Sequence, residues 1–157
     1  MNDIQTVKKN SKKGFTLVEL VVVIAILAIL AAIAIPVVAS TIASSQRSAA
    51  LSDAQTLELA LKEAHAQIIA KDTSVYPSDA TVATVVSKKS LQSIGVGTAA
   101  DSRTIGGTAY TLVWDATDDK CYWVDSTGKN LSEAKMGGTP TAAKDAIVDT
   151  KKVSDLF

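Results

Sequence analysis

A long apolar stretch near the N-terminus constrains this chain more than any other feature. Of the 25 residues from 15 to 39, 22 are apolar, and no charged residue lies between Leu20 and Ala39. As a helix, these 20 charge-free residues would span about 30 Å, which is the thickness of the hydrocarbon core of a bilayer. The stretch must be buried by a membrane or by other copies of the chain, and the rest has room for one small domain.

The charges are segregated along the chain. Residues 1–14 contain four lysines and one aspartate, a net charge of +3, whereas the remaining residues hold 12 basic and 15 acidic side chains, a net charge of −3. Lysines before an apolar span keep that end in the cytoplasm. We therefore expect a single-pass protein in the cytoplasmic membrane, with its N-terminus inside and its C-terminal part outside.

A cleaved secretory signal peptide also begins with basic residues and an apolar stretch, and Ala32-Ile33-Ala34 resembles its cleavage site. Two observations disfavour this interpretation. The apolar stretch is longer than the roughly 7–15 residues of a signal-peptide core. In addition, Glu19 lies within its first turn, where a carboxylate is costly. A plain membrane anchor would explain the length but not Glu19.

A specific motif stands at the start of the stretch. Residues 12–20 read KKGFTLVEL and are followed by an apolar helix that contains Pro36. This segment resembles the class III leader of type IV pilins and related pseudopilins. The resemblance implies that a membrane prepilin peptidase cuts between Gly14 and Phe15 and that the new amine of Phe15 is methylated. Glu19 then becomes the fifth residue of the mature chain.

Glu19 and the amine of Phe15 form a natural pair of opposite charges. After cleavage they would lie about one helical turn apart in an apolar setting, where each unpaired charge is disfavoured. The resemblance implies that Glu19 meets the Phe15 amine of an adjacent subunit and so sets the axial register of assembly. An intrachain contact, or a protonated Glu19 that is merely tolerated, remains an alternative.

The apolar stretch continues into a predicted amphipathic helix. No glycine occurs from residue 15 to residue 76, and one helix from Phe15 to about Lys71 is the simplest interpretation. Its second half carries an apolar stripe at spacings of three and four, which predicts packing on the chain's own domain: Ala50, Ala54, Leu57, Leu61, Ala64 and Ile68. Pro36 removes one amide donor, so we expect a kink or a loosened turn there.

The remaining residues, 72–157, predict a small α+β head. Ser78 is expected to cap a short helix over residues 79–86, although its β-branched side chains also allow a strand. The rest of the Ser- and Thr-rich segment 73–108 is expected to be an exposed loop. Residues 110–114 and 121–124 predict a β-hairpin, residues 130–136 predict a third strand, and the C-terminal tail is expected to pack back on the sheet.

Together these elements predict an α+β fold, a long N-terminal helix packed on a small antiparallel sheet, which the resemblance identifies as the pilin fold. We divide the chain into a leader (1–14), an assembly half (15–39) and an amphipathic half (40–71) of the helix, and a head (72–157). Many pilins close a C-terminal loop with a disulfide, whereas Cys121 has no partner here. A chain without a disulfide suits a Gram-positive, clostridial-type major pilin.

Few other residues of the chain are candidate ligands or binding groups. The acidic residues between Asp115 and Asp125 favour a hairpin turn over a calcium site, because the spacing of an EF-hand is absent. We expect His65, the one histidine, to lie on the surface or flank of the helix, and Cys121, the one cysteine, to be a small buried side chain. Trp114, Tyr122 and Trp123 are expected to be core residues rather than a binding patch. Residues 130–132 match the acceptor sequence for N-glycosylation, but we do not expect Asn130 to be glycosylated.

The motifs and charges of the sequence argue against two classes of function, enzymes and nucleic-acid-binding proteins. No catalytic or phosphate-binding motif is present, and we expect neither enzymatic activity nor a cofactor nor a metal. Residues 48–157 hold 11 basic and 14 acidic side chains, so nucleic-acid binding is not expected.

The resemblance implies a pilin precursor that polymerises with identical copies into an extracellular type IV pilus on the cell surface, for adhesion, motility or aggregation. Its partners would be the prepilin peptidase and methyltransferase and the pilus assembly machinery in the membrane. One alternative is a pseudopilin of a type II secretion or DNA-uptake system. A second is a membrane-anchored binding module that keeps residues 1–14.

Overall fold

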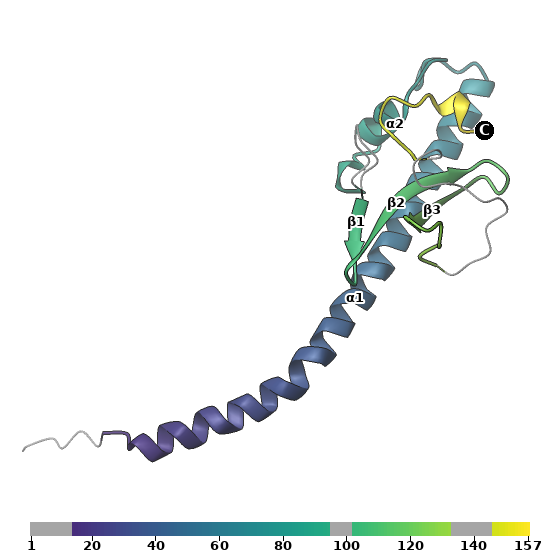
Figure 1. Ribbon diagram of the computed structural model, residues 1–157. Coiled ribbons are helices and arrows are strands. Elements are labelled where there is room, and N and C mark those ends of the chain that lie inside the picture. The colour runs from purple at the N-terminus through teal and green to yellow at the C-terminus, as the bar shows by residue number, and fades with distance from the viewer. Residues whose placement is uncertain (1–13, 95–101, 133–145) are drawn as a thin grey trace, which may run out of the picture. The chain divides into compact units, whose positions relative to one another are not determined.

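The computed structural model describes residues 14–94, 102–132 and 146–157, and its chain divides into two units after Ala39. The longest element is helix α1, Leu17–Ile69, whose residues up to 39 belong to the first unit and the rest to the second (Figure 1). The structure confirms the predicted α+β class, a long N-terminal helix with a small antiparallel sheet packed on its second half.

Within the first unit, α1 buries nothing. Its large apolar side chains from Leu17 to Val38 are all at least 49% exposed. α1 continues through Pro36 without interruption. Among the described residues, α1 is the one helix that is long and apolar enough to cross a membrane.

α1 ends two residues earlier than predicted, in a capping motif that has no glycine. Lys71 adopts the left-handed conformation (φ 57°), and the amide of Asp72 donates to the carbonyl of Gln67 while that of Lys71 donates to Ile68. This is the Schellman arrangement, in which glycine is the usual left-handed residue. A lysine there makes the end of the helix hard to locate from the sequence.

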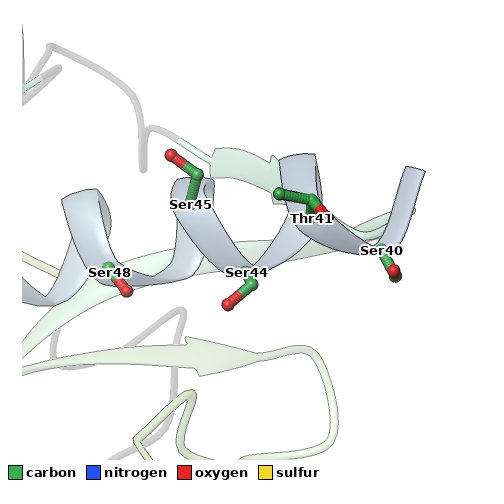
Figure 2. Close-up of a pocket in the computed structure, with 5 residues that line it drawn as sticks. All are labelled: Ser40, Thr41, Ser44, Ser45 and Ser48. Carbon is green, nitrogen blue, oxygen red and sulfur yellow. The ribbon is translucent and has the colours of Figure 1, made fainter. Parts of the chain in front are cut away.

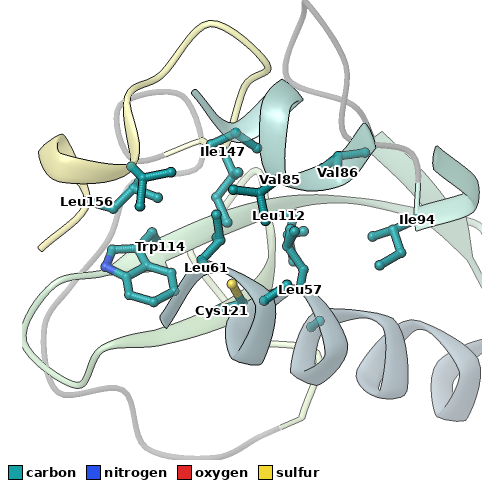
Figure 3. Packing of buried hydrophobic residues seen from close by; sticks show 14 of the residues in the cluster. Leu57, Leu61, Val85, Val86, Ile94, Leu112, Trp114, Cys121, Ile147 and Leu156 are labelled. Atoms are coloured by element: carbon teal, nitrogen blue, oxygen red, sulfur yellow. The ribbon is translucent and has the colours of Figure 1, made fainter. Parts of the chain in front are cut away.

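In the second unit, three antiparallel strands lie in the order β1-β2-β3: β1 is Ser102–Ile105, β2 is Thr108–Asp115 and β3 is Lys120–Asp125. The predicted hairpin is confirmed as β2 and β3, with Trp114 opposite Cys121. One face of this hairpin packs on the predicted stripe of α1, of which Ala50 to Ala64 are buried and Ile68 is partly buried (Figure 3).

The third strand was predicted wrongly. Residues 130–136 were expected to form it, but Asn130 makes only an isolated pair with Val124, and residues 133–136 lie outside the described residues. The third strand is β1, which joins β2 through Gly106 and Gly107, both at positive φ. Two residues of left-handed backbone are what a tight hairpin turn requires, so this glycine pair was the signal that was missed.

The short helix predicted over residues 79–86 is confirmed as α2, Val82–Lys88. The exposed loop predicted for the rest of residues 73–108 is wrong in the described part of that segment. It contains the 3-10 turn Gln92–Ile94 and strand β1, and it contributes buried apolar side chains to the core. Thr81, not Ser78, precedes α2, because residues 77–80 form a turn and the amide of Val82 donates to the carbonyl of Lys151. The valines of this segment therefore decide its structure more than its hydroxyl residues do.

The C-terminal tail packs back on the sheet, as predicted. Ala146 pairs with Val113, and the amide of Ile147 donates to the carbonyl of Leu112, so the tail occupies the edge of β2 that β1 leaves uncovered. A last 3-10 turn, Val153–Asp155, buries Val153 and Leu156. Phe157 stacks on His65 with 4.0 Å between ring centroids.

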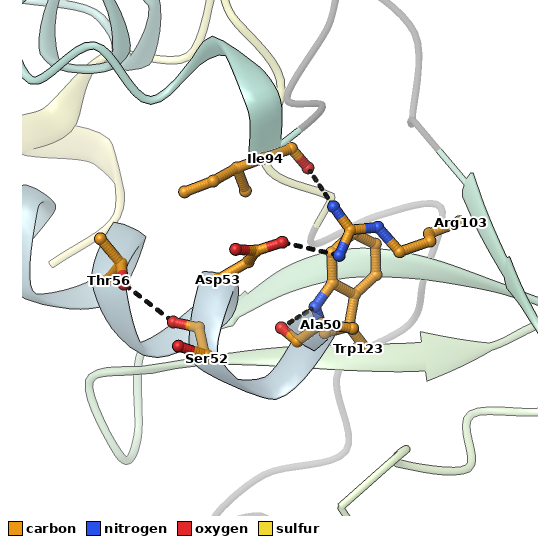
Figure 4. Close-up of polar contacts among 7 residues, drawn as sticks. All are labelled: Ala50, Ser52, Asp53, Thr56, Ile94, Arg103 and Trp123. Carbon is orange, nitrogen blue, oxygen red and sulfur yellow. Dashed lines mark hydrogen bonds and ion pairs between the residues drawn. The ribbon is translucent and has the colours of Figure 1, made fainter. Parts of the chain in front are cut away.

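A polar cluster joins the sheet to α1 (Figure 4). Arg103 of β1 donates to a carboxylate oxygen of Asp53 at 2.7 Å, and its guanidinium lies 5.2 Å from the ring centre of Trp123. The indole N–H of Trp123 donates to the carbonyl of Ala50 at 2.8 Å. Strands β1 and β3 are thus both fixed to the same turn of α1.

Two leucines of α1 test this account of the core. Leu61 is fully buried, and Leu61→Ala should lower the free energy of unfolding by about 2–5 kcal/mol, since it leaves a cavity between α1 and the sheet. Leu59 is 67% exposed, and Leu59→Ala should change that free energy by no more than about 0.5 kcal/mol. Urea unfolding of the chain in detergent micelles measures both values, and equal losses would contradict the packing described.

Candidate functional site

The candidate cleavage point lies in a short stretch that precedes α1. Residues 14–16 form no regular secondary structure. A side chain at Gly14 would meet no atom within 4 Å, and Phe15 is 91% exposed. Peptide bonds in exposed, irregular segments are the ones that proteases reach most easily. The bond between Gly14 and Phe15 is therefore accessible, while the leader residues before it lie outside the described residues.

Immediately after this bond, Thr16 and Glu19 close the start of α1. The amide of Thr16 donates to Oε2 of Glu19 at 2.8 Å, and the Thr16 hydroxyl donates to the same oxygen at 2.7 Å. In return, the amide of Glu19 donates to the Thr16 hydroxyl at 3.3 Å. This reciprocal pattern is a capping box, which satisfies amides that the first turn of a helix leaves without partners.

The capping box gives Glu19 a role that the sequence analysis did not assign. The pattern Thr-x-x-Glu before an apolar run is a recognised start signal for a helix, so it could have been read directly from residues 16–19. Both donors of Thr16 reach Oε2, and no described residue donates to Oε1. All the atoms of the box belong to residues that would remain after cleavage at Gly14.

Within its own chain, Glu19 contacts Thr16 through one carboxylate oxygen. This contact differs from an intrachain pairing with the Phe15 amine, which would exist only after cleavage and is not tested. A contact with the amine of another copy stays a prediction, because the structure contains a single chain. The same holds for Pro36, where α1 continues as a helix and a role in bending or melting is not tested.

The acidic residues of the hairpin are dispersed rather than gathered. Asp115 lies at one end of β2, whereas Asp125 pairs with Tyr110 toward the other end. Asp125 accepts hydrogen bonds from Thr127 and from the amide of Lys129, which closes the turn after β3. These bonds hold the pKa of Asp125 below its ordinary value. Among the described residues, no group of three His, Cys, Asp or Glu side chains is placed to hold a metal ion.

The remaining candidates serve the core. Trp114, Tyr122 and Trp123 are all buried, as predicted. Burial, followed by the hydrogen bond from its hydroxyl to Asp118, raises the pKa of Tyr122 to about 12. Cys121 is 7% exposed, and burial raises the pKa of its thiol well above the ordinary value, so it remains a small protonated core residue.

Asn130 does not present its side chain as an exposed acceptor. The residue is 7% exposed, and its side-chain oxygen accepts from the amide and the hydroxyl of Ser132. The glycosylation sequence found at residues 130–132 is thus folded into a turn.

Comparison with known proteins agrees with this part of the chain. Residues 9–35 match the family model of the prokaryotic N-terminal methylation motif. The match covers the end of the leader, the Gly14–Phe15 bond, the capping box and most of the apolar span. Comparison of the chain with curated proteins and with solved structures gives no match.

This motif indicates a precursor of the type IV pilin-like or pseudopilin-like kind. It implies processing by a prepilin peptidase and assembly into a pilus-like polymer. The long apolar helix near the N-terminus is consistent with a membrane-anchored precursor.

Replacing Thr16 tests the capping box. Thr16→Val removes the hydroxyl that both donates to Glu19 and accepts from its amide, so the first turn of α1 should open more often. The amides of that turn should exchange with solvent roughly 2- to 30-fold faster, as expected for the loss of a helix cap. Hydrogen exchange measured by NMR in micelles reports this change. Thr16→Ser keeps the hydroxyl and should exchange at the native rate; a native rate in Thr16→Val would contradict the assignment.

Proposed function

We propose that this chain is the precursor of a structural, non-catalytic type IV pilin subunit. Its leader, residues 1–14, is removed after Gly14, Phe15 is methylated, and the mature chain polymerises with identical copies into an extracellular filament. The observation that carries the proposal is the pairing of a processing motif with an unburied helix. Residues 9–35 match the methylation motif, and no other described residue covers the large apolar side chains of α1 from Leu17 to Val38.

Assembly would transfer the apolar half of α1 from lipid into a bundle of copies. Lipid tails are as apolar as these side chains, so the transfer gains no hydrophobic free energy and must depend on close packing and polar contacts. Alanine recurs through residues 25–34 and allows helices to approach closely. Glu19, held at the start of α1 by Thr16, keeps Oε1 available for the Phe15 amine of another subunit.

The use of the filament separates this proposal from its main alternative. A pseudopilin of a secretion or DNA-uptake system would share the motif and the long helix. We favour a surface pilus, used for adhesion, motility or aggregation, because pseudopilins of uptake systems tend to be shorter and to carry paired cysteines, whereas Cys121 is the only cysteine here. Long surface filaments made of this chain would support the pilus, and envelope-confined assemblies would support the alternative.

Leader removal is tested by the intact mass of the protein. In cells that contain a prepilin peptidase, the chain should lose residues 1–14 and begin at a methylated Phe15. Gly14→Leu should block the cut, because the peptidase would meet a bulky side chain at the scissile bond. The Cβ of the leucine meets no atom of the chain itself within 4 Å, so a lost cut would not reflect a folding defect. Retention of residues 1–14 in the native chain would contradict the pilin interpretation and favour a membrane-anchored binding module.

Glu19→Ala tests the assembly step by itself. The variant should still be inserted and cleaved, since the apolar span and the Gly14–Phe15 bond are unchanged, but it should form few filaments because the Phe15 amine loses its partner. Because Glu19→Ala also removes the cap, the matched control is Thr16→Val, which removes the cap, keeps the carboxylate and should form more filaments than Glu19→Ala. If Glu19→Ala produced filaments in native amounts, the pairing would be wrong.

A further inference from the structure

The charge-free part of α1 extends beyond the apolar stretch. After Glu19, the first charged residue is Arg47, so 27 consecutive residues, 20–46, carry no charge. As a helix they would extend about 40 Å, roughly 10 Å more than the hydrocarbon core of a bilayer. The last seven of these residues already belong to the second unit of the chain. The second unit therefore begins with an uncharged segment, residues 40–46, that is placed along the chain where lipid headgroups would lie.

Four of the seven residues in this segment carry hydroxyls. These four, Ser40, Thr41, Ser44 and Ser45, together with Ser48 just beyond Arg47, are exposed and line an open hollow on α1 (Figure 2). In helices, serine and threonine hydroxyls can donate to the carbonyls of the preceding turn, which makes them tolerable near lipid. They can also donate to the phosphate and ester oxygens of headgroups. Hydroxyls of this kind fit an interface better than they fit either the hydrocarbon core or a dry protein contact.

The turn between β1 and β2 lies beside residues 40–46 of α1. A Cβ placed on Gly106 would lie 3.7 Å from the Cβ of Ala43, so the tip of this hairpin rests beside the charge-free segment. Residues 106–109 are exposed and read GGTA, without a charge or a bulky side chain. This end of the head thus presents small neutral groups on two separate elements.

Among the described residues, charges begin only at a distance from this tip. On α1, Arg47 lies four residues, or about 6 Å, beyond Ala43. On β1, Arg103 is held inward by its ion pair with Asp53. On β3, Asp125 stands opposite Tyr110, which is three residues, or about 10 Å, along β2 from Gly107. The neutral zone is comparable in depth to the polar layer of one bilayer leaflet.

We propose that, in the membrane-inserted chain, the β1–β2 turn and residues 40–46 of α1 lie within the phospholipid headgroup layer, with Arg47 at its outer edge. The ligand of this surface is the bilayer itself. The head then rests against the membrane instead of standing clear of it on a bare helix. This inference rests on the membrane-inserted precursor of the proposed function and does not depend on filament formation.

Fluorescence quenching in vesicles tests the proposal. The full chain is reconstituted in phosphatidylcholine and phosphatidylglycerol vesicles and labelled with a polarity-sensitive fluorophore at single introduced cysteines. Thr108→Cys reports the β1–β2 turn, and Thr117→Cys, exposed in the loop at the opposite end of β2, is the matched control. Ala31→Cys reports insertion of the span. The native chain, with its buried Cys121, gives the labelling background.

Spin-labelled lipid headgroups should quench the probe at residue 108 at least about twofold more than the probe at residue 117, and lipids labelled deep in the acyl chain should quench residue 31. Equal quenching at 108 and 117 would overturn the proposal. So would a probe at 108 that is shielded from water but unaffected by headgroup labels, since a second copy would then cover the turn. An unquenched residue 31 would instead contradict the inserted state that the proposed function also requires.

Discussion

Within the described part of the chain, nothing covers the apolar half of α1, and the rest of the molecule is organised around that fact. Every large apolar side chain from Leu17 to Val38 is at least 49% exposed in the single chain. Such a surface is incompatible with an isolated protein in water. Lipid can cover it in the precursor and other copies can cover it in a polymer. This half of α1 can occupy both the membrane and a polymer because it is apolar on all sides, unlike the amphipathic second half.

One carboxylate interrupts that surface, at the point where the helix begins. Glu19 receives two hydrogen bonds from Thr16 and so closes the first turn of α1. This contact lowers the cost of carrying an acidic residue in the span, because the carboxylate already has donors before any neighbour arrives. It also fixes where the carboxylate points. A pairing with the amine of Phe15 from another copy would then act on a group that is already oriented, which favours one axial register.

Much of the fold follows from simple sequence patterns. The long helix follows from a run of residues without glycine, its buried stripe from Ala50 to Ala64 follows from spacings of three and four, and the β2–β3 hairpin follows from alternation; all three were predicted correctly. The predictions failed where weak local signals compete with tertiary contacts. β1 is only four residues long, and its pairing depends on a Gly-Gly turn and on the ion pair of Arg103 with a residue 50 positions earlier.

The candidate site was predictable from its motif but not from its geometry. The residues around Gly14 and Phe15 stand out by resemblance, and the methylation motif matched over residues 9–35 agrees with it. The capping box was present in the sequence as Thr16 and Glu19. The charge of Glu19 pointed to pairing with an amine, whereas its capping of the first turn of α1 was not predicted. The neutral end of the head could not be found from the sequence, because it requires knowing that Gly106 folds beside Ala43.

The central claim is that copies of the same helix bury the apolar segment. Cryo-electron microscopy of surface filaments purified from the native host tests it most directly. We predict a filament whose core is a bundle of helices formed by residues 15 to about 45, with each Glu19 within hydrogen-bond distance of the Phe15 amine of a neighbouring subunit. A filament in which these residues remain exposed, or surface filaments that lack this chain altogether, would contradict the account.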